Sequence, residues 1–316
     1  MHETIKNFPN QFSYVPEVVR GEKLGAYGRV IVAGMGGSGL AALLLKAWKP
    51  ELPLSIYQDY GLPIISDGYH GKTLIIVSSY SGNTEEVIDV FTKAIEKQIP
   101  VAVITTGGTL GELAEKHQTP LILLPNTGIQ PRSARGYSFM ALLKMLGDDA
   151  NLTEAAGIAK SLDAMRYEEQ GRALASWLSG AVPIIYSSRL NHAIAYNWKI
   201  TFNETGKVPA FCNSFPELNH NEMAGFDAHQ LVGRFRFVFL RDSDDNDRVK
   251  KRMEVLESLY RKRELPVESL DLHGASRLER IFSTLVIADW AAYHLAVRYG
   301  FDPENMPIVE EFKKLI

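Results

Sequence analysis

The chain has 316 residues, of which 46% are hydrophobic and 22% charged, and its formal net charge is -3. These totals are typical of a globular protein, and the length predicts two domains. The slightly acidic balance gives no reason to expect nucleic acid as a partner. No uncharged apolar run reaches the roughly 18 residues that a bilayer-spanning helix needs, so the sequence predicts no membrane segment.

The number of cysteines and the N-terminal residues indicate in which cellular compartment the protein is expected. The only cysteine, Cys212, cannot form an internal disulfide or a cysteine-based zinc framework, which fits a reducing compartment. The first residues, MHETIKNFPNQF, lack the apolar core of a secretory signal peptide. We therefore expect the protein in the cytoplasm.

The first half of the chain alternates short β-branched runs with amphipathic stretches, which predicts a parallel sheet covered by helices. Strands are predicted at Arg29–Ala33, Leu54–Tyr57, Thr73–Val77, Val101–Ile104 and Leu121–Leu124. Helices are predicted at Leu40–Trp48, Asn83–Glu96, Leu110–Lys116 and Tyr137–Leu146. The runs IIVSS and LILL show no polar alternation, which indicates strands that are buried on both faces.

A domain boundary is predicted near residue 150, giving domains 1–150 and 151–316, because Asn151 or Thr153 can cap a new helix there. The second half again alternates strands and helices. Strands are predicted at Val182–Ser187, Arg234–Leu240 and Pro266–Leu270. Helices are predicted at His192–Phe202, Asp247–Lys262, Arg277–Val297 and Ile308–Leu315. Each half has a strand that ends in two serines (IIVSS and IIYSS), which is a weak sign of duplication.

A glycine-rich turn follows the first predicted strand. In VIVAGMGGSGLAALLL, Gly34, Gly36 and Gly39 match the G-x-G-x-x-G pattern of dinucleotide sites. Asp59 follows the second strand, where an acidic residue binds the ribose in such sites. A nicotinamide-dependent oxidoreductase is therefore one interpretation, and a tight turn without a ligand is another. In any binding role, backbone N–H groups meet an anion at the positive end of a helix, and Ser38 adds a hydroxyl donor.

A second polar loop follows the third predicted strand. The segment SSYSGNTEE places Ser79, Ser81 and Thr84 before a helix that opens with two acidic residues. A helix cap formed by Thr84 or Asn83 would explain why one hydroxyl residue occurs here. It would not explain why the segment has three hydroxyl residues and a glycine. Because neighbouring parallel strands deliver their following loops to one crevice, we expect these hydroxyls and Ser38 to surround one phosphate. A dinucleotide site has no need of the second cluster, so the two loops favour a phosphomonoester ligand.

The segments GMGGSG and SYSGNT resemble the phosphosugar-binding loops of the sugar isomerase (SIS) domain family. The next segment, AVITTGGTLGELAEKH, is similar to that family's following strand, Gly-Gly turn and short helix. The resemblance implies that the substrate phosphate is bound by Gly37, Ser38, Ser79, Ser81 and Thr84. It also implies the fold class, α/β with two SIS-type three-layer α/β/α domains, each a mainly parallel sheet flanked by helices. These loops do not separate isomerases from proteins that only sense phosphosugars.

Aldose–ketose isomerisation needs a base that moves a proton between C1 and C2, and a group that opens the sugar ring. It also needs cations near the enediolate and the phosphate. The stretch NWKITFNETGKVPAFCNSFPELNHNEMAGF contains Glu204 and His220, with Lys199 and Lys207 nearby. This stretch resembles the C-terminal domain of bifunctional phosphoglucose/phosphomannose isomerases, in which Asn-Glu is followed by Asn-His-Asn-Glu. With the N-terminal loops and the tail, the resemblance covers nearly the whole chain.

The resemblance implies that Glu204 is the enediol base and that His220 opens the ring. Without it, Glu204 is an ordinary surface carboxylate at a helix end, and His220 is a hydrogen-bonded structural histidine. Their order in the chain, beside two phosphate loops, favours the catalytic interpretation.

The resemblance also implies two catalytic cations. The family's Pro-Arg pair falls in QPRSARGYSF, which makes Arg132 the cation beside the enediolate, with Arg135 as the alternative. The family's C-terminal lysine falls in VEEFKKLI at Lys313, with Lys314 as the alternative. Lys313 taken alone is a solvated lysine near a helix C-terminus, where positive charge is favourable.

No metal and no nucleotide cofactor are expected. A metal would need a ligand set, and His220, Glu222 and His229 match no compact ligand spacing. Glu222 is instead expected to orient the Asn-His-Asn loop. Cys212 is expected to be a small buried apolar residue, because the reaction needs no thiol nucleophile.

The expected function is the interconversion of glucose 6-phosphate and fructose 6-phosphate in glycolysis and gluconeogenesis, with mannose 6-phosphate as a further substrate. In the tail, Met306 replaces a family threonine that is associated with handling both C2 epimers. The alternatives are an isomerase of another phosphosugar, a phosphosugar sensor and the nicotinamide enzyme. The resemblance implies a homodimer whose active sites lie at the subunit interface, so that His220 serves the neighbouring subunit's site.

Overall fold

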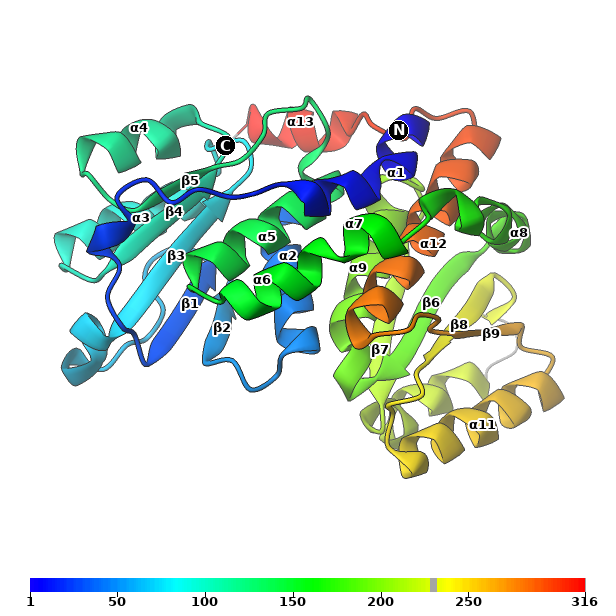
Figure 1. The fold of residues 1–316 in the computed structure, drawn as a ribbon. Coiled ribbons are helices and arrows are strands. Elements are labelled where there is room, and N and C mark those ends of the chain that lie inside the picture. The colour runs from blue at the N-terminus through cyan, green and yellow to red at the C-terminus, as the bar shows by residue number, and fades with distance from the viewer. Residues whose placement is uncertain (228–231, 316) are drawn as a thin grey trace. The chain divides into compact units, whose positions relative to one another are not determined.

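The computed structural model describes residues 1–227 and 232–315, which form two parallel sheets in two separate bodies (Figure 1). The first body comprises Asn7–Ser161, and the second comprises Met1–Lys6 together with the chain from Leu162 onward. The first body extends to Ser161, whereas the sequence predicted a boundary near residue 150. The helices after that point, α6 (Asp149–Ala156) and α7 (Ile158–Ser161), belong to the first body because they pack against its helices.

The cap of α6 also differs from the prediction. The Asp148 carboxylate accepts a hydrogen bond from the backbone N–H of Asn151 at 3.1 Å, so Asp148 is the N-cap residue. Asn151 and Thr153 lie inside the helix, and the Thr153 hydroxyl donates to the Asp149 carbonyl oxygen at 2.8 Å. The helix therefore begins three residues earlier than a cap at Asn151 would allow, and five residues earlier than a cap at Thr153 would allow.

The first sheet has the strand order β2-β1-β3-β4-β5, and all neighbouring strands are parallel. All five strands were predicted, and they are β1 (Arg29–Ala33), β2 (Leu54–Tyr57), β3 (Thr73–Ser79), β4 (Val101–Thr105) and β5 (Leu121–Leu123). Parallel strands bring their carboxyl ends to the same edge of the sheet. The loops that contain the glycine and serine motifs therefore meet at this edge.

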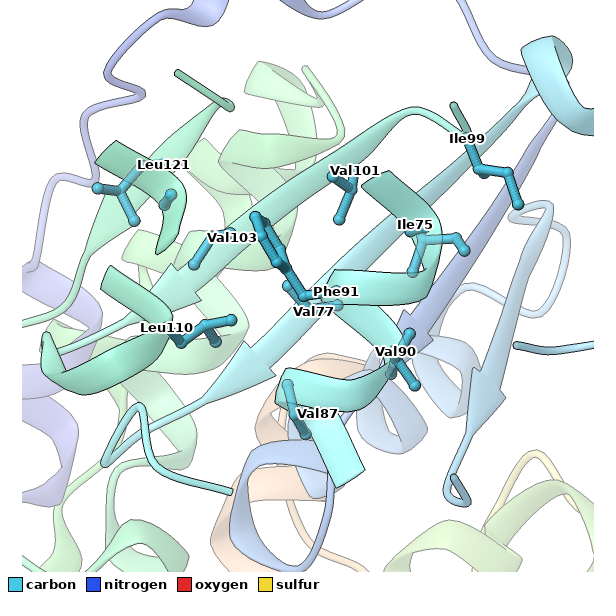
Figure 2. Packing of buried hydrophobic residues seen from close by; sticks show 13 residues of the cluster. Ile75, Val77, Val87, Val90, Phe91, Ile99, Val101, Val103, Leu110 and Leu121 are labelled. Atoms are coloured by element: carbon cyan, nitrogen blue, oxygen red, sulfur yellow. The ribbon is translucent and has the colours of Figure 1, made fainter. Parts of the chain in front are cut away.

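The core of the first body lies on both faces of this sheet. One face is covered by α3 (Glu85–Glu96) and α4 (Gly108–Lys116), and the other by α2 (Gly37–Trp48) and α5 (Arg135–Met145) (Figure 1). Figure 2 shows Phe91 reaching from α3 toward the strand residues Val77 and Val103. The apolar positions of α3 recur at helical spacing, so one stripe of this helix is buried.

The second sheet has the strand order β7-β6-β8-β9 and is also parallel. Its strands are β6 (Val182–Ser188), β7 (Phe211–Phe215), β8 (Phe235–Arg241) and β9 (Val267–Asp271). The strands β6, β8 and β9 were predicted, but β7 was missed. The sequence of β7, FCNSF, is short and mixes polar with apolar residues, because this strand lies at the edge of the sheet.

Helices cover both faces of the second sheet as well. On one face lies α11 (Asp247–Lys262), and on the other lie α8 (Glu168–Leu178), α9 (His192–Glu204) and α12 (Arg277–Arg298) (Figure 1). Both bodies thus have three α/β/α layers, which confirms the predicted fold class. No helix in the described part of the chain is long and apolar enough to span a membrane.

Two short helices at the ends of the chain complete the second body. The first, α1 (His2–Lys6), was not predicted, and it packs on α12, where the rings of His2 and Trp290 meet edge to face at 4.8 Å. The last, α13 (Pro307–Lys313), confirms the predicted C-terminal helix.

Replacing Phe91 with alanine is expected to lower the free energy of unfolding of the first body by about 3–5 kcal/mol, because it leaves a cavity in a fully buried cluster. Urea unfolding measures this change. The control is Thr92→Ala on the exposed side of the same helix, which is expected to change the free energy by less than about 0.5 kcal/mol. An effect of Phe91→Ala no larger than that of the control would contradict this description of the core.

Candidate functional site

Three helices of the first body begin at the carboxyl edge of its sheet. The N-cap residues of α2, α3 and α4 are Gly36, Thr84 and Gly107, and among the described residues none of them makes a side-chain capping hydrogen bond. The first backbone N–H groups of a helix have no partner within the helix, and they form a positive end that favours an anion. The amino ends of α2 and α3 therefore suit a phosphate, whereas the backbone N–H groups of Thr109 and Leu110 at the start of α4 donate to the second loop.

Side chains of these loops connect one loop to the next. The Ser38 hydroxyl oxygen accepts a hydrogen bond from the backbone N–H of Tyr80 at 2.9 Å, which joins the first loop to the second. The Asn83 side-chain oxygen accepts from both the backbone N–H and the hydroxyl of Thr109, at 3.1 and 3.0 Å, which joins the second loop to α4. The Asn83 side chain thus caps the start of α4. Its position in the sequence also allowed a cap of α3, which the side chain does not form in the described part of the chain.

The second loop contains its own hydrogen-bond network. The hydroxyl groups of Ser79 and Thr84 share a hydrogen bond of 2.8 Å, and the Ser79 oxygen also accepts from the backbone N–H of Gly82 at 3.1 Å. Ser79 is fully buried, whereas Thr84 is half-buried and Ser81 is exposed. The geometry therefore gives Ser79 a role in orienting Thr84, in addition to its predicted role as a phosphate ligand.

The segment with the Pro-Arg pair lies directly against the first loop. A Cβ atom added to Gly37 would lie 2.6 Å from the backbone nitrogen of Arg132 and 2.8 Å from the carbonyl oxygen of Pro131. Arg132 and the phosphate loops are therefore neighbours at one edge of the first sheet. The alternative cation, Arg135, is buried with its guanidinium 5.6 Å from the ring centroid of Phe8, a cation–π contact inside the body.

In the second body, Glu204 is the last residue of α9 and is half-buried. The ammonium group of Lys207 donates to the carbonyl oxygen of Glu204 at 2.6 Å and also to the carbonyl oxygen of Asn305. Asn305 precedes α13, which ends at Lys313. The structure thus brings the turn after Glu204 together with the start of the C-terminal segment.

The two lysines proposed for the C-terminal position are both exposed. The ammonium group of Lys313 lies 3.1 Å from a carboxylate oxygen of Glu310 in the same helix, and its side chain is 61% exposed. Lys314 is the C-cap residue of α13. An exposed pair one helical turn apart contributes little to stability, so the contact with Glu310 does not hold Lys313 in one position.

His220 lies far from Glu204 within the second body. It ends the short helix η7 (Glu217–His220), is exposed, and follows the carboxyl end of β7. Helix α9 runs back from the carboxyl edge of the sheet to the amino edge, so Glu204 lies at the start of β7. The four steps between the five strand residues, at about 3.3 Å each, place about 13 Å between the two ends of this strand.

The loop that contains His220 is held by Glu222. One carboxylate oxygen of Glu222 accepts from the Tyr186 hydroxyl at 2.6 Å, and the other accepts from the Asn213 side-chain amide. Tyr186 lies in β6 and Asn213 in β7, so both strands fix this carboxylate. Burial, with a contribution from Glu222, raises the pKa of Tyr186 and keeps its hydroxyl protonated as a donor. This arrangement agrees with the predicted role of Glu222 in orienting the loop.

The carboxyl edge of the second sheet contains a network of charged side chains. The Arg277 guanidinium donates to the Asp242 carboxylate and to the side-chain oxygen of Asn191, the latter at 2.6 Å. Asn191 in turn donates to Asp245 at 3.0 Å and to Ser188 at 3.2 Å. The donors at this edge thus bind carboxylates of the chain itself, whereas the first sheet has glycine loops and the amino ends of α2 and α3 at the same place.

The remaining candidates of the sequence concern metals and the thiol. The described residues contain no group of three or more His, Cys, Asp or Glu side chains that is arranged to hold a metal ion. His229 lies outside the described residues. Burial raises the pKa of the half-buried Cys212 thiol to about 11, so this thiol is protonated at neutral pH.

Comparisons with known proteins place the chain among phosphosugar enzymes. A family model described as the bacterial phospho-glucose isomerase C-terminal SIS domain matches residues 167–316. The bifunctional phosphoglucose/phosphomannose isomerase of Thermoplasma volcanium is 36% identical over 93% of each chain. The enzyme of the same name from Caldicellulosiruptor bescii is 34% identical over 99% of this chain and 98% of its own.

A solved structure gives the same result for the fold. The C-terminal domain of glucosamine-fructose-6-phosphate aminotransferase from Francisella tularensis matches with a TM-score of 0.70, covering 96% of each chain. The sequence identity is 14%, so this likeness shows the fold alone.

Replacing Gly37 with alanine is expected to lower the free energy of unfolding of the first body by about 1–3 kcal/mol, because the new Cβ would collide with the backbone of Arg132. Gly28→Ala is the matched control, since a Cβ there meets no atom within 4 Å, and a change below about 0.5 kcal/mol is expected. Urea unfolding of both variants measures the difference. Equal stability of the two variants would show that the Pro131–Arg132 segment does not lie against this loop.

Proposed function

We propose that this chain, which belongs to the bifunctional phosphoglucose/phosphomannose isomerase family, interconverts glucose 6-phosphate and fructose 6-phosphate and also accepts mannose 6-phosphate. The observation that carries the proposal is the meeting of three glycine- and hydroxyl-rich loops with the amino ends of α2 and α3 at one sheet edge. Neutral hydroxyl and N–H donors are suited to a dianionic phosphate that must bind and leave at each turnover. Gly37, Ser38, Ser79, Ser81 and Thr84 are its proposed ligands.

The chemical step in this proposal follows from the groups that the family assigns. His220 protonates the ring oxygen as the C1–O5 bond breaks, and the anomeric O1 hydroxyl releases its proton to solvent, which leaves the open-chain aldehyde. Glu204 then removes the proton from C2 of the open aldose and returns it to C1, and the hydroxyl proton on O2 passes to O1 through the cis-enediol. Arg132 and Lys313 stabilise the negative charge that develops on these oxygens. The reverse sequence converts the ketose into an aldose.

We further propose that the enzyme acts as a homodimer with shared active sites. The supporting observation is the topology: Glu204 ends the helix that precedes β7, and His220 follows the carboxyl end of β7, so the strand separates the two residues in the chain and in the sheet. A base and a ring-opening group that act on one hexose need to lie within a few ångströms of it. A two-fold assembly provides this proximity by combining Glu204 of one subunit with the histidine of the other.

Specificity between the two aldose substrates is a separate part of the proposal. Met306 lies beside α13 at the position of the family's threonine, and its thioether cannot donate a hydrogen bond. The resemblance associates that threonine with the handling of both C2 epimers, so its replacement is expected to affect mannose 6-phosphate more than glucose 6-phosphate. We expect a slower reaction with mannose 6-phosphate than with glucose 6-phosphate, which the assay below measures directly.

Glu204→Gln tests the catalytic assignment. In a coupled assay with chelator present, the wild type is expected to convert both aldose phosphates and fructose 6-phosphate. The variant is expected to lose at least about 100-fold in kcat, because glutamine cannot accept the C2 proton. Calorimetric affinity for fructose 6-phosphate is expected to stay within about threefold of the wild type. The exposed Glu268→Gln is the control, and a folded Glu204→Gln protein with wild-type kcat would remove Glu204 from this role.

Mixing two inactive variants tests the shared active site. Glu204→Gln and His220→Ala homodimers are each expected to be inactive. After joint refolding, half of the dimers combine the two variants and contain one intact site of two, so about a quarter of wild-type activity is expected. Mixing the proteins without subunit exchange is the control. No activity after exchange would show that both residues act within one chain.

A further inference from the structure

Lys207 adopts a backbone conformation that usually favours glycine. After α9 the chain turns sharply, and Lys207 has a left-handed φ of 57°. The turn is closed by backbone hydrogen bonds from Gly206 to the carbonyl of Thr201 and from Val208 to the carbonyl of Phe202, both of 3.2 Å. Glycine takes this position at many helix ends because a Cβ makes the left-handed region unfavourable. A lysine here therefore requires an explanation from its side chain.

Three other residues that are not glycine have the same backbone conformation, so this conformation alone does not explain why a lysine stands at position 207. Gln98, Gln118 and Glu264 hold the same left-handed conformation just after α3, α4 and α11. The Gln118 side chain reaches only the carbonyl of Glu115 in its own helix. Lys207 differs because its ammonium group also reaches Asn305, which lies 98 positions along the chain.

The two carbonyl groups that Lys207 contacts belong to two parts of the candidate site. One is the carbonyl of Glu204, in the last turn of α9, where a cation is favoured by the helix dipole. The other is the carbonyl of Asn305, two residues before α13 begins. An ammonium group has three donors and no acceptor, so it can bind both oxygens at once.

The C-terminal helix has little apolar anchorage of its own. Ile308 and Phe312 are 78% and 60% exposed, and no residue of α13 is buried. The preceding segment is held by a turn in which the backbone N–H of Glu304 donates to Asp302, and by an ion pair of Glu304 with the N-terminal amine. The contact from Lys207 connects this segment to the turn after Glu204.

We propose that Lys207 is a positioning residue that fixes the C-terminal segment, with Lys313, relative to the base Glu204. This inference rests on the proposed isomerase function. Lys207 acts through Glu204 and Lys313 and needs no contact with the sugar. Misplacement of a reacting group by about 1 Å can lower a rate about 100-fold, so loss of this connection affects kcat more than KM.

Lys207→Met and Lys207→Gly test the proposal together. Both are expected to lower kcat about 10- to 100-fold with KM within about threefold of the wild type. Lys207→Gly relieves the left-handed backbone, so its thermal stability is expected to equal or exceed that of the wild type while kcat falls. Lys207→Arg keeps the charge and is expected to recover most of the activity. Glu264→Gly relieves the same conformation at an exposed helix end and is expected to retain wild-type kcat.

Hydrogen exchange gives a readout that does not depend on activity. Residues 301–315 are expected to exchange about tenfold faster in Lys207→Gly than in Glu264→Gly. If Lys207→Met fails to fold, the glycine variant alone decides the question. Wild-type kcat with unchanged exchange in Lys207→Gly would overturn the proposal, as would a rise in KM at unchanged kcat. If the wild type proves to have no isomerase activity, the proposed function fails, and faster exchange would still support the connection itself.

Discussion

Close backbone contact between neighbouring loops is the constraint on which the candidate site depends. A Cβ on Gly82 would lie 1.8 Å from the carbonyl oxygen of Gly107, and a Cβ on Gly108 would lie 2.5 Å from the carbonyl oxygen of Ser81. All three glycines also have positive φ values. The loops after β3 and β4 can approach this closely only without side chains at these positions. Their contact brings the serine hydroxyls and the helix amino ends to one edge of the first sheet.

The two bodies have the same three-layer architecture, but the polar groups at the carboxyl edges of their sheets differ. At the first sheet, the polar groups of the carboxyl edge are hydroxyls and backbone N–H groups, which suit an external anion. At the second sheet, Arg277 and Asn191 bind Asp242 and Asp245, so the chain supplies the anions itself. Burial raises the pKa of Asp245 and lowers that of Arg277, which shows how strongly this edge is withdrawn from water. In the proposed mechanism the second body therefore supplies Glu204 from the end of a helix and His220 from a loop.

Hydrogen bonds from neighbouring elements orient the proposed catalytic groups. Glu222 is fixed by donors from β6 and β7 and orients the loop that contains His220. Lys207 binds the carbonyls of Glu204 and Asn305, and Ser79 binds the hydroxyl of Thr84. When a second residue holds a catalytic group in place, the catalytic group moves less. The second residue does not occupy the space that the substrate needs. The proposed mechanism depends on these supporting contacts as much as on the reacting groups.

The sequence by itself determined the α/β class, eight of the nine described strands, eight of the helices, and the residue types of both loops, because periodicity and glycine spacing are local properties. It missed β7, whose stability comes from pairing with β6 and not from its own composition. It predicted a boundary near residue 150, whereas the first compact body extends to Ser161 because α6 and α7 pack against its helices. Only the tertiary structure placed Arg132 beside Gly37, separated Glu204 from His220 along β7, and joined Lys207 to Asn305. These relations depend on contacts between residues far apart in the chain, which no local pattern encodes.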